Sequence, residues 1–297
     1  MRLTIWGCRG SVPTPGPATV RYGGNTSCVE VALRDQAALV LDAGTGIRPL
    51  GLELARRATR RIHLLLTHLH LDHLEGLRFF APLWDPEVVL DIWGPPSPVL
   101  SLRERIARSF SPPLFPVDLN AVPAQVTFHD IPREPWTVDG ISLAADLVLH
   151  PGPTVGFRIE SEESSVAYLP DHEPALAGAI SETPTEWMSG ASVATDADVL
   201  LHDAQYFEDE YAERIGWGHS SVADAVGFTR AVGAHSLVLF HHEPAHADGA
   251  LELLEARAQS LAGGNGIAPR LAHEGMVLEL PYPPKTPSPA GPEAHRT

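Results

Sequence analysis

Cysteine is scarce in this 297-residue chain, which contains only Cys8 and Cys28. A fold held together by several disulfides is therefore excluded, and such low cysteine use is typical of a reducing compartment. Apolar runs are short as well, because none approaches the ~20 residues that a membrane-spanning helix needs. The first residues enter a strand pattern without the apolar core of a signal peptide. The sequence thus predicts a cytoplasmic protein with no membrane partner.

Basic residues are also few, since 21 Lys and Arg stand against 37 Asp and Glu, which gives a formal net charge of -16. A broad electrostatic grip on nucleic acid generally needs a basic face, so nucleic acid is disfavoured as a partner. Hydrophobic residues make up 44% of the chain, enough for one large core or two smaller ones. We expect one domain over residues 1–280, followed by a proline-rich, disordered tail over residues 281–297.

Short apolar segments rich in β-branched residues recur along the chain and predict strands. A first group covers residues 3–6, 28–33, 38–41, 62–66, 88–93 and 141–149, and a second covers 154–159, 165–169, 199–201, 237–240 and 276–280. Helical periodicity covers residues 47–58, 77–83, 99–110, 222–232 and 249–261. Ser220 or Ser221 fits the N-cap of the fourth helix. The pattern predicts an α/β fold in which two mixed sheets pack face to face with helices outside, an αββα sandwich.

The most informative segment follows the apolar strand that ends at Leu66 and reads Thr67-His68-Leu69-His70-Leu71-Asp72-His73. Alternation points His68, His70 and Asp72 one way and lets His73 turn aside, so this loop can serve two neighbouring divalent ions. Imidazole and carboxylate are the ligands that zinc, manganese and iron prefer. A polar turn that happens to be rich in histidine is the alternative. Four ligand-type side chains directly behind a strand favour the metal.

Further ligand candidates follow other apolar strands. His150 comes after residues 147–149, Asp171 after residues 166–170, and the pair His241 and His242 after residues 237–240. Any one of these alone fits a capped turn or an ordinary buried histidine. Together they favour a dinuclear site, because residues at strand ends project into a shared crevice and a carboxylate such as Asp171 can bridge two ions.

The order of these motifs resembles the metallo-β-lactamase superfamily and, within it, the ribonuclease Z-like phosphodiesterase branch. The resemblance spans residues 3–280. It rests on Gly7-Cys8-Arg9-Gly10-Ser11, Gly23-Gly24-Asn25-Thr26-Ser27, Leu41-Asp42-Ala43-Gly44-Thr45-Gly46, the His68 to His73 cluster, His150-Pro151-Gly152, Asp171, Leu201-His202-Asp203-Ala204, Gly218-His219-Ser220-Ser221 and Phe240-His241.

The resemblance implies the roles of individual residues. One metal would be held by His68, His70 and His150, and a second by Asp72, His73 and His241, with Asp171 bridging. Asp42 would orient ligand histidines, and His242 would be a rim or packing residue, although the choice of His241 over His242 rests on its place at the strand end. His219 would contact the scissile phosphate, positioned by Asp203, and Asp72 is grouped with these two as catalytic.

The implied activity is hydrolysis of a phosphodiester by a hydroxide held between two divalent ions, with zinc favoured over manganese or iron. No basic arm for transfer RNA is evident. The segment 95–123 fits a lid over a small pocket and fits a surface helix equally well. These features favour a small phosphodiester, with a cyclic nucleotide as the first choice.

Other activities stay open at this point. Within phosphate chemistry they are processing of RNA ends and hydrolysis of a cyclic sugar phosphate. Outside it they are a thioester or lactam hydrolase of the same superfamily and a non-catalytic nucleotide-binding sensor. Gly218-His219-Ser220-Ser221 favours phosphate chemistry. Relatives in this branch often pair, which suggests a homodimer, but the sequence does not specify an oligomeric state.

Overall fold

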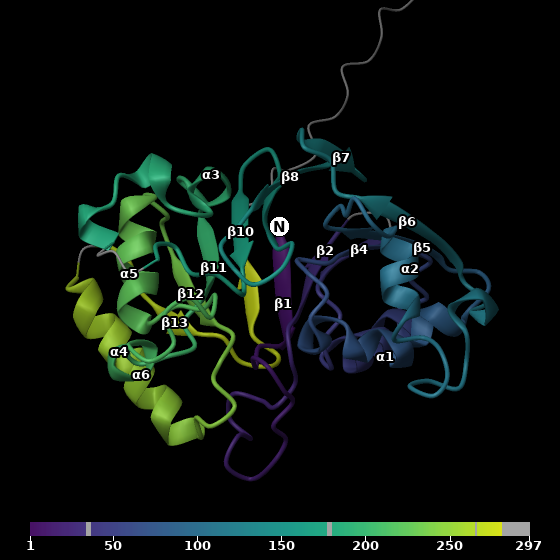
Figure 1. Cartoon of the computed structure of the whole chain (residues 1–297), viewed down its shortest axis with the longest axis horizontal. Coiled ribbons are helices and arrows are strands. Elements are labelled where there is room, and N and C mark those ends of the chain that lie inside the picture. The colour runs from purple at the N-terminus through teal and green to yellow at the C-terminus, as the bar shows by residue number, and fades with distance from the viewer. Residues whose placement is uncertain (34–36, 177–179, 265, 281–297) are drawn as a thin grey trace, which may run out of the picture.

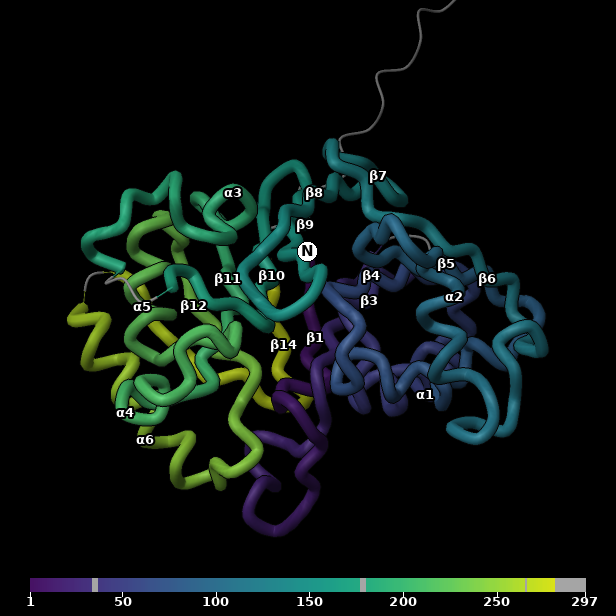
Figure 2. The backbone as a smooth tube through the Cα atoms, in the orientation of Figure 1, coloured from purple at the N-terminus to yellow at the C-terminus, as the bar shows by residue number. Residues whose placement is uncertain are grey.

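Two β-sheets stacked face to face form the centre of the molecule (Figure 1). The computed structural model describes residues 1–33, 37–176, 180–264 and 266–280. The tail predicted to be disordered, residues 281–297, lies outside the described residues. In Figure 2 the first half of the chain lies to one side and the second half to the other, and strands β1 and β14, from the two ends of the domain, pair between them. The predicted αββα sandwich is confirmed.

The first sheet has the strand order β14-β1-β2-β3-β4-β5-β6 within the described residues. Its strands are β1 (Arg2–Gly7), β2 (Cys28–Ala32), β3 (Ala37–Leu41), β4 (Arg61–Leu65), β5 (Val89–Gly94), β6 (Gln125–Asp130) and β14 (Val277–Glu279). Neighbours from β3 to β6 are parallel, whereas β14, β1, β2 and β3 pair antiparallel. The parallel strands therefore end at one common edge.

The second sheet has the order β13-β12-β11-β10-β9-β8-β7 in the same part of the chain. Its strands are β7 (Trp136–Val138), β8 (Ile141–Leu147), β9 (Val155–Glu160), β10 (Ser165–Leu169), β11 (Val199–Asp203), β12 (Leu237–Phe240) and β13 (Arg270–Leu271). Neighbours from β10 to β13 are parallel, and β7 to β10 pair antiparallel. Strand β8 consequently runs in the same direction as β10, so the loop that follows it lies at the same edge.

Helices cover the outer face of each sheet. They are α1 (Ile47–Arg56), α2 (Leu102–Ala107), α3 (Ala191–Ala194), α4 (Glu208–Tyr211), α5 (Val222–Ala231) and α6 (Asp248–Ala262). Short 3₁₀ turns span Leu71–His73, Glu75–Phe79, Ala81–Trp84, Leu119–Ala121, Ile180–Glu182 and Thr185–Trp187. Within the described ranges, no helix combines the length and the apolar character needed to cross a bilayer.

Three apolar clusters correspond to the three interfaces between layers. The central cluster joins inward-facing side chains of both sheets, such as Leu3, Val31, Phe157 and Phe240. One outer cluster packs α1 and α2 on the first sheet, and the other packs α3, α5 and α6 on the second. Strand β10 is buried along its whole length because both of its faces are covered, which explains its continuous apolar sequence.

One expected helix was wrong, and sheet membership does not follow the order of strands in the sequence. The strands do not divide between the sheets by sequence half, because β8 joins the second sheet and β14 returns to the first. The antiparallel pairing of Leu3 with Leu278 places the last strand beside the first. The helix expected over residues 77–83 is instead two 3₁₀ turns, the second with Pro82 in its first turn. Proline lacks the N–H that a continuing α-helix needs.

The segment 95–123 supplies helix α2 to the outer layer of the first sheet. The helix starts at a capping box formed by Ser101 and Glu104, and its Leu102 and Ile106 belong to the outer cluster on that sheet. Farther along, the ring of Phe115 contacts that of Phe79, with centroids 5.8 Å apart. A role of this segment as a lid stays a prediction.

The central cluster predicts a large cost for truncating Phe157, whose side chain is fully buried. Phe157→Ala should lower the free energy of unfolding by about 3–5 kcal/mol, because it removes apolar contacts and leaves a cavity. Urea unfolding followed by circular dichroism measures this loss. Phe79→Ala is the matched control, since Phe79 is 59% exposed and its loss should change stability by no more than about 0.5 kcal/mol. Similar effects of the two variants would contradict this account of the core.

Candidate metal centre

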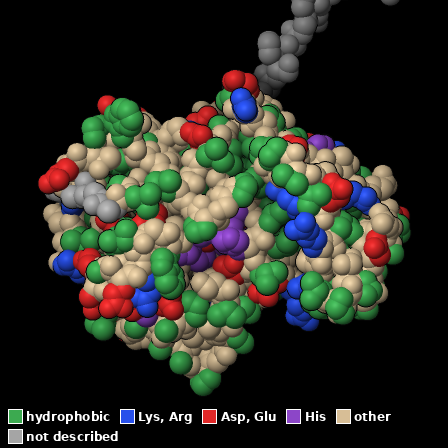
Figure 3. Space-filling model, viewed as in Figure 1, with side chains coloured by type: hydrophobic (Ala, Val, Ile, Leu, Met, Phe, Trp, Pro, Cys, Tyr) green, Lys and Arg blue, Asp and Glu red, His purple; other side chains and the backbone are tan. Residues whose placement is uncertain are grey.

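The carboxyl ends of strands from both sheets converge on one cluster of histidines and carboxylates. The segment from His68 to His73 follows β4, and His150 lies in the loop after β8. Asp171 follows β10, and His241 follows β12 directly. Figure 3 shows histidine side chains gathered in a hollow at the middle of one face, between the two halves of the molecule. All seven predicted metal ligands are thus brought together.

Among the described residues, four overlapping groups of side chains could hold a metal ion, and two of them together contain all seven predicted ligands. His68, His70 and His150 form one, in which His150 Nε2 lies 3.1 Å from His70 Nδ1. Asp72, His73, Asp171 and His241 form the other. Two donor atoms held ~2.0–2.1 Å from one tetrahedral ion lie roughly 3.3 Å apart. The donor atoms of each group are therefore spaced closely enough to bind one divalent ion.

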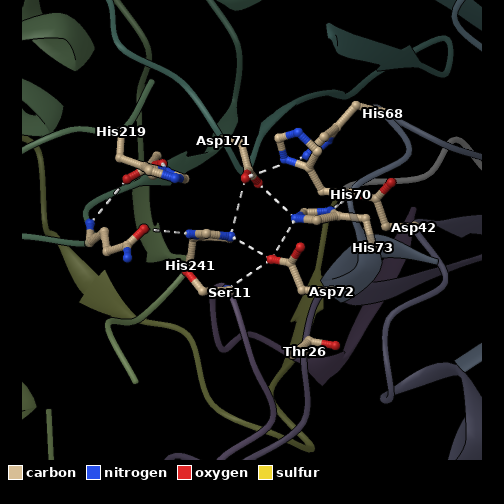
Figure 4. A network of polar contacts seen from close by, with 12 residues as sticks. Ser11, Thr26, Asp42, His68, His70, Asp72, His73, Asp171, His219 and His241 are labelled. Carbon is tan, nitrogen blue, oxygen red and sulfur yellow. Dashed lines mark hydrogen bonds and ion pairs between the residues drawn. The ribbon is translucent and has the colours of Figure 1, made fainter. Parts of the chain in front are cut away.

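Asp171 lies between the two groups (Figure 4). Its Oδ2 atom is 3.7 Å from Nε2 of both His68 and His150. The same carboxylate reaches the other group, with Oδ1 2.9 Å from His73 Nε2 and Oδ2 3.2 Å from His241 Nε2. This is the position that a bridging carboxylate must occupy.

Asp72 completes the second group from the other side. Its Oδ2 atom lies 3.3 Å from Nε2 of both His73 and His241. The backbone N–H of Ser11 donates to the same oxygen over 2.8 Å. The carboxylate is thereby fixed in a direction that faces both imidazoles.

Unpaired buried atoms test whether these residues suit a metal. His68 Nε2, His73 Nε2 and Asp171 Oδ1 are buried and lack a hydrogen-bond partner among the described residues. The contact between His73 Nε2 and Asp171 Oδ1 is close but is not aligned for a hydrogen bond. A buried polar atom without a partner costs about 1–3 kcal/mol. A divalent cation would satisfy all three atoms, so the residues fit the group that the fold implies.

Asp42 orients two of the imidazoles from behind. Its Oδ2 atom is 2.9 Å from His73 Nδ1 and accepts a hydrogen bond from the Tyr168 hydroxyl over 3.1 Å. Its Oδ1 atom accepts from the backbone N–H of Thr67 over 2.8 Å. The Thr67 hydroxyl, which also contacts Asp42, lies 3.0 Å from His68 Nδ1. Both imidazoles therefore present Nε2 to the centre, as metal-ligating histidines do when their other nitrogen is held.

Glu173 stabilises the loop behind His150. His150 Nδ1 lies 2.9 Å from the carbonyl oxygen of Gly218. The buried carboxylate of Glu173 accepts from the N–H groups of Gly216 and Gly218 and from the hydroxyl of Tyr211. Because Glu173 follows Asp171 by two residues, one segment positions both a candidate ligand and the loop that orients another.

His241 and His242 face opposite directions. His241 points Nε2 toward Asp72 and Asp171, with Nδ1 3.0 Å from Gln205 Oε1. The buried His242 instead places Nε2 2.8 Å from the carbonyl oxygen of Ala272. The geometry therefore makes His241 the candidate ligand and gives His242 a packing position.

Charge and burial set the protonation of the cluster. Burial lowers the pKa of His150 to about 4 and that of His68 well below its usual range. Burial also opposes a charge on His73, but Asp171, Asp72 and Asp42 outweigh it and raise the pKa of His73 well above normal. The first two imidazoles are neutral, the form that binds metal. The carboxylates around the third make that part of the site favourable for a cation.

His219 and Asp203 form a pair beside the two groups. His219 Nδ1 lies 2.6 Å from Asp203 Oδ2. Its ring stacks on that of His241, with centroids 4.8 Å apart, and meets the ring of His150 edge-on at 5.0 Å. Burial lowers the pKa of His219, but Asp203 outweighs burial and raises that pKa to about 9. Residues 219 and 203 are thus placed beside both ligand groups.

Backbone N–H groups hold Asp203 itself in place. Its Oδ1 atom accepts from the N–H groups of Gln205 and Ser220, over 3.0 and 3.1 Å, and its Oδ2 atom accepts from that of His172 over 3.3 Å. Ser221 begins helix α5 as its N-cap. A strand end and a helix start therefore fix the geometry of the pair.

Several residues that support the ligands were not given that role from the sequence. They are Ser11, Thr67, Tyr168, Glu173, Gln205 and the carbonyl group of Gly218. Thr67 and Glu173 adjoin or lie close to predicted ligands in the sequence, which is a usable signal. Tyr168 reads as an ordinary core residue of a strand, and only the packing of the two sheets brings its hydroxyl to Asp42.

Comparison with known proteins places this site in a family. A family model described as a β-lactamase superfamily domain matches residues 38–242. A ribonuclease Z of Haloarcula marismortui is 28% identical over 323 aligned residues, covering 95% of this chain and 98% of the relative. The crystal structure of human tRNase Z, short form, has a TM-score of 0.63 at 20% identity, covering 95% of this chain and all of that one. Unliganded yeast PDE1 has a TM-score of 0.65 at 16% identity, covering 94% and 99% of the two chains.

The chain belongs to the metallo-β-lactamase superfamily, in its ribonuclease Z-like branch. It is a metal-dependent hydrolase. The family and the fold expected from the motifs are thereby confirmed.

Asp42 offers a test of the orienting contacts. Asp42→Asn should weaken zinc binding by roughly 10–100-fold, because an amide cannot accept from His73, Thr67 and Tyr168 at once. Competition with a chromophoric chelator measures the affinity. Asp42 has a positive φ of 60°, which asparagine tolerates, so backbone strain does not explain a loss.

Asp139→Asn is the matched control for that substitution. Asp139 also has a positive φ, 43°, and contacts His63, but it is not among the candidate ligands or their hydrogen-bond partners. Its replacement should leave zinc affinity unchanged. Equal losses for the two variants would show that Asp42 does not act through the ligand histidines.

Proposed function

We propose that this hydrolase cleaves a phosphodiester at a site holding two divalent ions. One ion would be held by His68, His70 and His150, and the other by Asp72, His73 and His241, with Asp171 facing both groups. The observation that carries the proposal is the pair His219 and Asp203. It places a non-ligand imidazole beside both ligand groups, with rings 4.8 and 5.0 Å from His241 and His150.

Bound divalent ions at such a site lower the pKa of a coordinated water to about 7 and neutralise charge on phosphoryl oxygens. Zinc is the first choice because the donor set is imidazole with carboxylate. The chain's own residues keep these donors in position. Asp42, Thr67, the Gly218 carbonyl and Gln205 engage the outer nitrogens of four histidines.

His219 serves the substrate in this proposal. Asp203 engages Nδ1, so Nε2 is the nitrogen available to a phosphate oxygen or to the leaving oxygen. The three backbone donors to Asp203 keep the carboxylate from turning away. Asp72 is a ligand of the second ion in this proposal and lies across the centre from His219. The backbone N–H of Ser11 fixes its orientation.

The substrate we favour is a small phosphodiester, with a cyclic nucleotide first. The support is the acidic balance of the chain, 37 Asp and Glu against 21 Lys and Arg, which is unfavourable for a broad grip on RNA. A cytoplasmic location and a homodimer remain predictions alongside this one.

A second candidate function is processing of RNA ends. The ribonuclease Z of Haloarcula marismortui aligns over 95% of this chain, and the human tRNase Z, short form, shares the fold. The two candidate functions use the same metal centre, and both hydrolyse a phosphodiester bond. They differ in what the surface around the centre must bind.

Turnover of defined diesters tests the chemistry. Zinc- or manganese-loaded protein is incubated with 3′,5′- and 2′,3′-cyclic nucleotides and bis(p-nitrophenyl) phosphate, and the products are separated by chromatography. Asp171→Ala provides the blank. His219→Ala should reduce kcat by roughly 10²–10⁴-fold, because the imidazole that assists the leaving group is lost. The metal content of the variant should stay that of the wild type.

His235→Ala is the matched control, because the His235 side chain is 67% exposed and lies outside the cluster. It should turn over every substrate like the wild type. If His219→Ala also did so with metal bound, the role assigned to His219 would be wrong. Failure of the metal-loaded wild type on all diesters would remove the phosphodiesterase proposal itself.

Salt dependence separates the two substrate classes. A 3′-extended transfer RNA precursor should not be cut, and cyclic nucleotide turnover should change little between 50 and 200 mM salt, since few phosphates are neutralised. Binding of the RNA with an affinity falling about 10³–10⁵-fold over that range would reveal six to ten phosphate contacts. Cleavage of such a precursor would establish the RNA-processing alternative.

A further inference from the structure

The orientation of His241 depends on a chain of two further side chains. His241 Nδ1 lies 3.0 Å from Gln205 Oε1, and Gln205 Nε2 donates to Glu243 Oε2 over 2.6 Å. Gln205 and His241 are both buried, at 2% and 1% exposure. Gln205 contacts His241 at Nδ1, the ring nitrogen turned away from Asp72 and Asp171, so its effect on the site passes through His241.

The chemistry of the three groups fixes the direction of this chain. An ionised carboxylate has no proton to donate, so Glu243 must receive the amide N–H of Gln205. The amide oxygen is then the atom that faces His241, and it accepts a hydrogen bond from Nδ1–H. His241 therefore carries its proton on Nδ1, which leaves the Nε2 lone pair directed at the centre.

The backbone holds His241 in this place against an unfavourable conformation. His241 has a φ of 59°, in the left-handed region that a residue with a side chain seldom adopts. Its ring packs on the backbone of Gly10, where an added Cβ would lie 2.4 Å from Nδ1. The tight fit leaves the imidazole little room to turn over and exchange its two nitrogens.

Gln205 also contacts the other half of the site. Its backbone N–H donates to Asp203 Oδ1 over 3.0 Å, and Asp203 holds His219. Glu243 is anchored in turn, because Arg9 donates to its carbonyl oxygen over 3.2 Å. The same short segment after β11 thus supports both the candidate ligand and the non-ligand histidine.

We propose that Gln205 and Glu243 are positioning residues that set the tautomer of His241 and so make it a metal ligand. The inference rests on the proposed function, in which His241 binds one of two ions. Gln205 supplies the acceptor for Nδ1–H, and Glu243 keeps the amide of Gln205 from rotating by half a turn. Neither side chain touches the metal or the substrate.

Zinc affinity, measured by chelator competition, tests this relay of hydrogen bonds from Glu243 through Gln205 to His241 with three variants. Gln205→Met keeps the approximate side-chain length and removes the acceptor, so affinity should fall by roughly 10–100-fold. Glu243→Met removes only the restraint on the amide, so a smaller loss is expected. The double variant Gln205→Glu with Glu243→Gln places a carboxylate beside His241 and an amide behind it. The exchange keeps an acceptor beside Nδ1–H of His241 and reverses only the bond behind it, because the amide at position 243 now donates to the carboxylate at position 205. Zinc affinity should therefore return to within about threefold of that of the wild type.

The exposed Gln259 of α6 supplies the control, since Gln259→Met should leave zinc affinity unchanged. Rescue by the double variant is a result that a simple packing role does not produce. Thermal unfolding of the metal-free proteins shows whether Gln205→Met folds, and the double variant gives the decisive comparison if it does not.

Two failures are distinguishable in this experiment. If the wild type bound zinc no more tightly than His241→Ala, His241 would not be a metal ligand, and that part of the proposed function would be wrong. If the wild type bound zinc through His241 but Gln205→Met retained its affinity, or the double variant was no better than Gln205→Met, the relay would be wrong while the metal centre stood.

Discussion

The buried carboxylate of Asp171 is the contact on which the site depends. It follows a strand covered on both faces and lies within 3.7 Å of ligand nitrogens in both groups. Burial would raise its pKa, but the imidazoles of His241 and His73 hold that pKa well below its usual range. A buried charge is stable only when it is paired. The cluster of histidines and the anion at its centre therefore require each other.

A second layer of polar contacts makes that cluster usable. Asp42 and Gln205 accept from the outer nitrogens of His73 and His241, and Glu173 fixes the loop whose carbonyl group accepts from His150. These carboxylates and amides come from strand ends and loops of both sheets. The direction in which each imidazole points is thus a property of the whole sandwich and not of the histidine-rich segment alone.

Much of this arrangement was predictable from particular residues. Three histidines and an aspartate after an apolar strand indicated metal chemistry, and apolar alternation indicated two sheets with outer helices. All the candidate ligands do meet at one centre. The sequence did not show that β8 and β14 change sheets, because sheet membership depends on pairing between strands far apart in the chain. It did not reveal Tyr168 or Gln205 either, since each looks like an ordinary core or turn residue until its partner is in place.

Features that involve only neighbouring residues were determined by the sequence, and features that involve distant segments were decided by the tertiary structure. Ligand type, spacing within residues 68–73 and the apolar periods of the strands are properties of neighbouring residues, and the sequence by itself determined them. Which of His241 and His242 faces the centre, which nitrogen each imidazole presents and where Asp171 lies between the groups were decided only by the tertiary structure. Those features depend on contacts between segments far apart in the chain, such as Asp72 and His241, which are 169 residues apart, and such contacts exist only once both sheets have packed together.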